Sequence, residues 1–335
     1  MAKKIKDTDY LGLSARVRAM ETKLLTREKM ERLLDARSNE EAAKLIQECG
    51  YPELDPSRPE EMDAALFQVR RDTLEDLADS APDSRFIQLF RLKYDYHNAK
   101  ALLKAAAMGT DPASMLLDLG RVSVEDLRAA VREGDLENLP GKLGRGYAEA
   151  KEVLETTRDP QLADMILDNW SYKDMFALAK ETGSDFLTGY VRIQVDAANL
   201  RSLVRTLRMG KSADFLKLAL FQGGEVDPED VLRVSANAGA GLDGVYGPTG
   251  LSAAAECAAE ALKTGAPLTE FERLCDDAVS EYLSSSQFVP FGEAPLVGYL
   301  AARETEYTNL RILLLGRGAG LSADVIRSRL RAVYV

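Results

Sequence analysis

Side chains that commonly do chemistry are few in this sequence, and those present lack the surroundings that the chemistry needs. His97 is the single histidine, which removes most metal sites and most histidine-based proton transfer. Gly239-Ala-Gly-Leu-Asp-Gly matches a dinucleotide pattern, but that pattern requires a preceding strand, and the residues before it have a helical pattern. Gly210-Lys211-Ser212 matches the end of a phosphate loop, yet Arg205 occupies the place of that loop's first glycine. We therefore predict no catalytic residue, no metal site and no bound cofactor.

A different set of polar side chains recurs three times at constant spacing. Each copy has an acid, an asparagine three residues later, a base two residues after the asparagine and a glycine eleven residues after it. The copies are about 100 to 110 residues apart, which is the size of a small domain. They consist of Asp95, Asn98, Lys100 and Gly109; of Asp196, Asn199, Arg201 and Gly210; and of Glu306, Asn309, Arg311 and Gly320.

The spacing places the acid and the asparagine of each copy on one face of a helix, because residues three apart are neighbours there. One interpretation is architectural: acid, asparagine and base join adjacent helices and satisfy polar atoms in a tight crossing. The other is functional, with the three polar faces lining a common cavity or rim. We favour the architectural interpretation, since most polar pairs repeated between units hold those units together.

The bases raise a second question, which is whether they bind a partner. Arg201, Arg205 and Arg208 recur at helical spacing and form a basic stripe beside the second asparagine. A solvated face is the simpler interpretation of such a stripe. The alternative is that basic side chains hold another protein, and the candidate residues for this are Lys100, Arg201, Arg205, Arg208 and Arg311.

The elements that position these residues are predicted to be helices almost throughout. Apolar residues recur at three- and four-residue steps, whereas alternating runs of Val, Ile and Thr are rare. Ser123, Asp227 and Ser322 each precede carboxylates and are predicted N-caps, and the repeated glycines are predicted helix ends. A glycine-rich loop is expected over residues 237–250, and Trp170, the single tryptophan, is expected in the core. The predicted helical stretches are residues 13–34, 72–77, 86–108, 147–154, 185–209, 251–262, 268–283 and 295–315.

Composition limits the class of protein and its partners. A chain of 335 residues, 46% of them hydrophobic, can bury one large core or two or three small ones. Its apolar stretches are far shorter than the roughly 20 residues that span a bilayer, so no direct membrane insertion is expected. The formal charge of −11 argues against nucleic acid as the main partner. Three scattered cysteines and an N-terminal segment without an apolar signal region predict a cytoplasmic protein.

Further shared positions extend the repeat and predict three units. A Leu-x-Asp motif precedes each asparagine helix, and the segments that begin at Gly120 and Gly224 share a valine and a Glu-Asp pair at the same offsets. We expect a first helical unit over residues 1–112, including the N-terminal helices, a second over 113–226 and a third over 227–335. Three similar units in one chain predict quasi-threefold symmetry.

The repeated acid-x-x-Asn-Leu-Arg helix resembles the C subunit of bacterial and archaeal V-type ATPases, the counterpart of the d subunit in eukaryotic vacuolar ATPases. Two end segments share the resemblance: Tyr10-Leu-x-x-x-Ala-Arg-Val-Arg-Ala-Met-Glu near the start, and Phe291-Gly-Glu-Ala-Pro-Leu-Val-Gly-Tyr-Leu near the end. The resemblance covers the chain from about Asp9 onward. Ala99 departs from it, because the family usually has a larger aliphatic residue after the asparagine, and this weakens the match of the first copy.

The resemblance implies an all-α, funnel-shaped protein of three helical units related by pseudo-threefold symmetry. It implies a non-catalytic coupling subunit that receives the tip of the central shaft, formed by the D and F subunits, and sits on the proteolipid ring of the membrane rotor. Such a protein is cytoplasmic, is peripheral to the membrane, and serves ATP-driven ion transport or ATP synthesis. The basic residues around the asparagine helices would then help to hold the shaft. A stand-alone helical-repeat scaffold that binds peptide or protein partners is the alternative.

Overall fold

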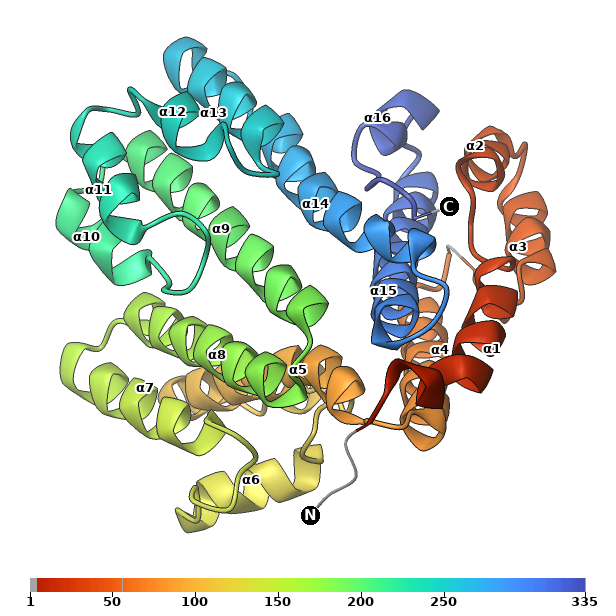
Figure 1. Ribbon diagram of the computed structural model, residues 1–335, viewed down its shortest axis with the longest axis horizontal. Coiled ribbons are helices and arrows are strands. Elements are labelled where there is room, and N and C mark those ends of the chain that lie inside the picture. Colours follow the sequence, from red (N-terminus) through yellow and green to blue (C-terminus); the bar gives the residue numbers. More distant parts are fainter. Residues whose placement is uncertain (1–4, 56, 335) are drawn as a thin grey trace. The chain divides into compact units, whose positions relative to one another are not determined.

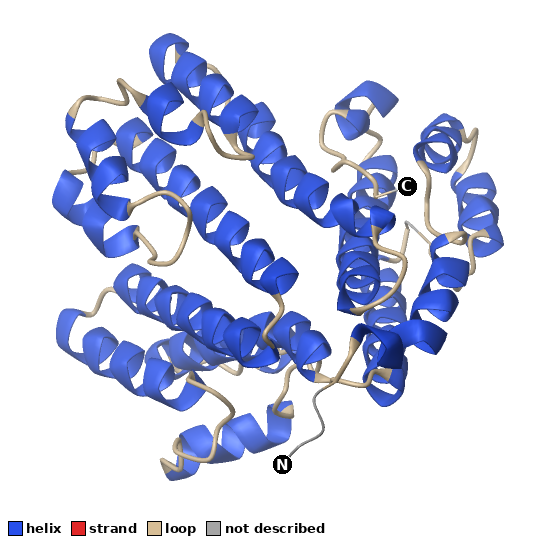
Figure 2. Ribbon diagram, in the orientation of Figure 1, coloured by secondary structure: helices blue, strands red, loops and turns tan. Residues whose placement is uncertain are grey.

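The computed structural model describes residues 5–55 and 57–334, which form helices joined by loops and no strand (Figure 2). Helical residues make up 73% of this part of the chain, against roughly one third in an average globular protein. The all-α prediction is therefore confirmed. Within the described ranges, no helix combines the length and the apolar character that crossing a bilayer requires. Contacts divide the chain into two compact units: a terminal unit of Met1–Ser84 with Leu242–Val335, and a central unit of Arg85–Gly241.

The central unit contains the first two asparagine helices, α5 and α9. Helix α8 contacts α5, α7 and α9, so its apolar residues are distributed around most of the helix and not along one stripe (Figure 1). Helices α10 and α11 contact each other and α9. The elements of this unit are α5 (Arg85–Met108), the 3-10 helix η2 (Ala113–Met115), α6 (Val124–Glu133), α7 (Leu143–Thr157), α8 (Pro160–Thr182), α9 (Asp185–Arg208), α10 (Ala213–Ala219) and α11 (Pro228–Ala236).

The terminal unit is built around the third asparagine helix, α15. Leu310 and Leu313 on α15 pack in one apolar cluster with Leu33, Ile46 and Met62 from the three helices α2, α3 and α4. Helix α15 also contacts α1, α14 and α16. The elements of this unit are η1 (Asp7–Tyr10), α1 (Leu11–Glu21), α2 (Arg27–Asp35), α3 (Asn39–Glu48), α4 (Pro59–Ser80), α12 (Leu242–Tyr246), α13 (Ser252–Thr264), α14 (Thr269–Ser284), η3 (Ser285–Phe288), α15 (Glu293–Gly318) and α16 (Ala323–Arg327).

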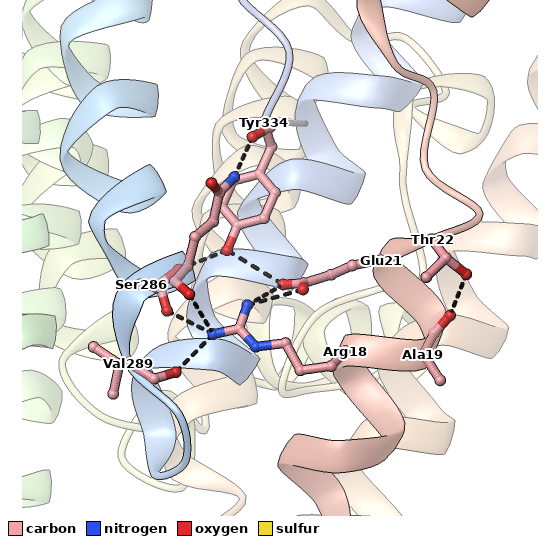
Figure 3. A network of polar contacts seen from close by, with 8 residues as sticks. Arg18, Ala19, Glu21, Thr22, Ser286, Val289 and Tyr334 are labelled. Atoms are coloured by element: carbon pink, nitrogen blue, oxygen red, sulfur yellow. Dashed lines mark hydrogen bonds and ion pairs between the residues drawn. The ribbon is translucent and has the colours of Figure 1, made fainter.

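Polar contacts join the N-terminal helix α1 to η3, to the loop that follows it and to the last described residue of the chain (Figure 3). The Arg18 guanidinium donates from Nη2 to the backbone oxygens of Ser286 and Val289, each at 2.7 Å. Its Nη1 lies 2.8 Å from Oε2 of Glu21, which holds the guanidinium in this orientation. The Tyr334 hydroxyl lies 2.7 Å from Ser286 Oγ and donates to Glu21 Oε1 at 3.3 Å. Three segments that are distant in sequence are thereby fixed to one another.

Three expectations about local structure are corrected by the fold. The predicted helix over residues 13–34 is two helices, because the Thr26 hydroxyl accepts a main-chain hydrogen bond and starts α2 separately from α1. The predicted loop over residues 237–250 contains the short helix α12. Helix α8 lies outside the predicted stretches, although Asp159 caps its start and Gly183 ends it in the left-handed conformation.

The repeats predicted from the sequence are distributed over both units. The first and second asparagine helices lie in the central unit, whereas α15 lies in the terminal unit. Helix α4 precedes the first asparagine helix in sequence but packs against α15. The division into residues 1–112, 113–226 and 227–335 follows the sequence pattern and stays a prediction.

Candidate functional site

The asparagine of each repeat makes the same pair of contacts. Its Nδ2 donates to the backbone oxygen of one residue in the segment that follows its helix, and its Oδ1 accepts from the amide of that same residue. We call these contacts the asparagine clamps. They join Asn98 to Leu117 at 2.8 and 2.8 Å, Asn199 to Phe221 at 2.8 and 2.8 Å, and Asn309 to Arg331 at 3.0 and 2.8 Å.

The clamps lie where an unpaired backbone group would be costly. The side chains of Asn98, Asn199 and Asn309 are at most 1% exposed, and a buried backbone group without a partner costs about 1–3 kcal/mol. Each clamp satisfies one N–H and one C=O at once, and fixes the segment after the helix against it. This geometry supports the architectural interpretation of the repeated asparagine.

In two of the three copies, the repeated acid accepts hydrogen bonds from the same segment that the asparagine holds. Asp95 accepts from the amides of Arg121 at 2.8 Å and Val122 at 3.3 Å, four and five residues beyond the clamped residue. Asp196 accepts from the amides at the same offsets, Glu225 at 2.8 Å and Val226 at 3.1 Å. The third copy differs: Glu306 accepts from the amide of Leu25 at 3.2 Å, and the residue at the first of these offsets, Val335, lies outside the described residues.

A glycine makes room for this carboxylate in the first two copies. A Cβ atom on Gly120 would lie 2.1 Å from Oδ1 of Asp95, and one on Gly224 would lie 2.0 Å from Oδ1 of Asp196. The glycine that the two segments share in sequence is thus required by close approach of a side chain. Burial raises the pKa of Asp95, Asp196 and Glu306 above the ordinary values, although the donated hydrogen bonds oppose the shift.

The repeated glycine ends each asparagine helix, as predicted. Gly109, Gly210 and Gly320 have φ of 64°, 62° and 71°, and in each copy the next amide donates to the carbonyl five residues back. Two residues after the glycine, a side-chain oxygen accepts from the main chain of a short helix. In the second and third copies this oxygen belongs to Ser212 and Ser322, which cap α10 and α16. The N-caps predicted at Ser123, Asp227 and Ser322 are confirmed.

Two of the repeated bases pair with acids on a neighbouring helix of their own unit. Lys100 Nζ on α5 lies 2.5 Å from Oδ1 of Asp168 on α8. Arg311 on α15 forms two contacts with Asp63 on α4, at 2.8 and 3.1 Å. Both pairs are partly exposed, so each contributes little to stability but fixes the orientation of its base. Their availability to a partner is reduced accordingly.

The second copy presents its basic stripe differently. Arg201 is half-buried, and its positive charge lowers the pKa of Tyr172 on α8. Burial outweighs this effect, so the pKa of Tyr172 is raised to about 12. Arg205 and Arg208 are exposed on the last turn of α9. Each of the three has an interaction partner within the chain. Of the five candidate partner-binding residues, Arg205 and Arg208 combine exposure with a position at a helix end.

The two nucleotide-like motifs have local structural roles. Gly210 ends α9 and Ser212 caps α10, so the Gly-Lys-Ser sequence is a helix stop followed by a helix start. Gly239 and Gly241, both with φ of 89°, lie in the turn after helix α11. A helix and not a strand therefore precedes the dinucleotide-like pattern, as the sequence indicates.

Comparison with known proteins places nearly the whole chain in one family. A family model described as ATP synthase (C/AC39) subunit matches residues 13–329. The chain belongs to this family. The C subunit of the V-type sodium ATPase of Enterococcus hirae is 25% identical over 332 residues, covering 97% of this chain and 99% of the relative. The C subunit of the V-type ATP synthase of Thermus thermophilus is 28% identical over 319 residues, covering 91% and 93%. The C subunit of the A-type ATP synthase of Methanocaldococcus jannaschii is 26% identical over 347 residues, covering 96% and 86%.

A buried ion-pair bridge in this C/AC39 family member escapes prediction from the sequence. Arg121 Nε lies 2.6 Å from Oδ2 of Asp95, and its Nη2 lies 2.8 Å from Oδ2 of Asp174 on α8. The Arg121 side chain is only 7% exposed, so the bridge joins the first clamp to α8 away from solvent. The second copy has Glu225 at this position, so comparing the repeats conceals the role of the arginine.

The expectation that Trp170 lies in the core is wrong. Its side chain is half-buried on α8, and its Nε1 donates to Glu149 Oε2 at 2.7 Å. Lys173 Nζ stands 4.6 Å from the centre of its ring. The tryptophan lines an open groove of the central unit, and the residues of α8 that are buried include the smaller Ala163, Leu167 and Leu178.

Proposed function

We propose that this chain is a non-catalytic coupling subunit of a rotary V/A-type ATPase. In this role it links the central shaft, formed by the D and F subunits, to the proteolipid ring of the membrane rotor during ATP-driven ion transport or ATP synthesis. One observation carries the proposal: the family match spans residues 13–329, and the relatives named above are the C subunits of such enzymes along nearly their whole length.

The chemistry of the repeated residues supports a mechanical role. The asparagines and two of the three acids form hydrogen bonds with the backbone of the segment that follows each helix. Such contacts stiffen a helical unit, and a coupler must transmit torque without deforming. The nucleotide-like motifs are helix ends, which supports the expectation that no cofactor binds there.

The proposed location is cytoplasmic and peripheral to the membrane. An acidic chain with a formal charge of −11 is repelled by anionic lipid, so attachment would depend on the ring protein. The division into three repeats would supply three similar surfaces to partners, which is the proposed reason for the triplication of the asparagine helix.

We further propose that basic side chains help to hold the shaft. Long, flexible Lys and Arg side chains tolerate a mismatch of symmetry between shaft and socket better than close apolar packing does. Lys100 and Arg311 already form ion pairs within the chain, so we expect them to contribute less to shaft binding. Arg201 is half-buried, and reversing its charge could unfold the protein. Arg205 and Arg208 are the residues to test.

Charge reversal of Arg205 and Arg208 to glutamate should weaken binding of purified D–F shaft and make that binding more sensitive to salt, while ring binding is retained. The matched control reverses Arg132 and Lys151, which are exposed basic residues of the same unit with side chains 75% and 55% exposed. If both folded variants bind the shaft equally well across a salt series, the shaft-contact proposal is wrong.

The function as a whole is tested by purifying an affinity-tagged copy of the chain from membranes solubilised in mild detergent. The proposal predicts that the D and F subunits and the ring proteolipid are recovered with it in fixed ratio. The alternative, a stand-alone helical-repeat scaffold, predicts recovery of other proteins and none of these subunits.

A further inference from the structure

A groove in the central unit is lined by none of the repeated asparagines, acids and bases described above. It has a volume of about 950 Å³ and is bordered by the start of α7, one face of α8, part of α9 and the loop of residues 222–225. Trp170, Lys173, Ala177 and Lys180 line it from α8, and their spacing of three and four residues places them on one helical face.

The groove is strongly basic in a protein that is acidic overall. Five cationic side chains line it, against the single carboxylate of Glu225. Four of the five cationic residues are exposed and the fifth is half-buried, and over the described residues no ion pair joins any of them to an acid. The five are Lys142, Arg145, Lys173, Lys180 and Arg192. A concave surface with this charge attracts an anionic partner.

Two aromatic side chains give the groove an apolar floor that is held in place by glycines. A Cβ atom on Gly146 would lie 2.8 Å from Cβ of Trp170, and one on Gly223 would lie 2.5 Å from Cε2 of Phe176. Both aromatic side chains therefore pack directly on backbone. The hydrogen bond from Trp170 to Glu149 further fixes the indole. Rigid rings beside cations suit a ligand that has both apolar and anionic parts.

The distribution of charge favours a protein segment over a compact phosphate group. Lys173 and Lys180 are seven residues apart, which is about 10 Å along a helix. The remaining cations lie at or just before the start of α7 and on α9. A phosphate held by main-chain amides is also disfavoured, because the amides of Lys142, Glu225 and Val226 already donate to buried aspartates. Carboxylates on successive turns or alternate residues of a peptide match the spread of cations better.

We propose that this groove binds an acidic segment of a partner protein. Carboxylates of the segment pair with Lys173, Lys180 and Arg145, and an apolar side chain between them packs on Trp170 and Phe176. The chemistry does not depend on which protein supplies the segment. The proposal therefore goes beyond the assignment to a rotary enzyme, and its failure would leave that assignment intact.

The probe is a short labelled peptide of glutamates around one central phenylalanine, titrated into the full chain. Fluorescence anisotropy of the label measures binding, and the emission of Trp170 reports where it occurs, because this is the only tryptophan in the chain. Reversing Lys173 and Lys180 to glutamate should weaken binding about tenfold or more at low salt. Arg145→Glu, on a different helix, should weaken it as well, which keeps the test valid if the double variant does not fold.

The matched control reverses Arg132 and Lys151, so that net charge changes by the same amount away from the groove. The proposal predicts near wild-type affinity for this control, weaker binding of a peptide with serine in place of phenylalanine, and a change in Trp170 emission. Equal weakening of both double variants, or binding without an emission change, would overturn the proposal. So would tighter binding of sodium triphosphate through the same lysines, or no peptide binding at all.

Discussion

Removal of the second asparagine clamp should be the most damaging single truncation in the repeat. Asn199 is fully buried, and both backbone groups of Phe221 that it satisfies are buried with it. In Asn199→Ala these two groups lose their partners, at about 1–3 kcal/mol each, or about 2–6 kcal/mol together. Natural domains are stable by about 5–15 kcal/mol in total. The variant should therefore lose a large part of the stability of the central unit.

The other two clamps should matter less, because water can reach their partners. The contacts of Asn98 with Leu117 and of Asn309 with Arg331 are only partly buried. We expect each alanine variant to cost about 1–2 kcal/mol. Asn199→Asp tests the donor separately. An aspartate can still accept from the Phe221 amide but cannot donate to its carbonyl, so we expect a cost at least as large as that of alanine.

Urea unfolding followed by Trp170 emission measures the costs at Asn98 and Asn199, since Trp170 lies on α8 and α8 packs against α5 and α9. The cost at Asn309, which belongs to the terminal unit, is measured by the loss of helical circular dichroism in urea. Asn237→Ala is the control: the Asn237 side chain is exposed and donates to the Arg233 carbonyl at 3.2 Å. Its loss should change the free energy of unfolding by less than about 0.5 kcal/mol. If Asn199→Ala and Asn237→Ala destabilise equally, the clamp is not what holds the segment, and the reasoning from repeated hydrogen bonds fails.

Three further variants test other parts of the architecture. Gly120→Ala places a methyl group against the repeated carboxylate, and in urea unfolding it should cost about 3 kcal/mol or more. The control is Gly134→Ala: Gly134 has open space around it and a φ of 77°, so this change should cost only about 1–2 kcal/mol. Lys100→Met should cost less than about 1 kcal/mol, and a double-mutant cycle with Asp168→Asn should show a coupling that high salt removes; a salt-independent coupling contradicts an exposed ion pair. Tyr334→Phe removes two hydroxyl contacts and should lower the stability of the terminal unit by about 1 kcal/mol in thermal unfolding; an unchanged melting temperature contradicts the role of the C-terminal contact.

Local sequence signals predicted the asparagine helices well. An apolar period of three and four residues and a glycine at a fixed distance from Asn98, Asn199 and Asn309 were sufficient, because a glycine in the left-handed conformation ends a helix regardless of its tertiary surroundings. Helix α8 shows the limit of this approach. It packs on three helices, so its apolar residues surround it, and no single stripe marks it. Its end signals, Asp159-Pro160 and Gly183, were present but have weaker statistical weight than periodicity.

The candidate site was also only partly predictable from the sequence. The repeat indicated which residues matter, but it did not indicate what they contact, since the clamped residues differ in type: Leu117, Phe221 and Arg331. Only their backbone is held, and backbone contacts leave no trace in side-chain chemistry. The basic groove was missed because Lys142, Lys173 and Arg192 come from three helical regions that only the fold brings together.

The most direct test of the proposed coupling is ATP-driven ion uptake by inverted membrane vesicles from cells that lack this chain. We expect that the catalytic head still hydrolyses ATP while ion uptake is lost, and that adding the purified wild-type chain restores uptake. Ion uptake at the normal rate in the absence of the chain would contradict the claim that it links the shaft to the ring.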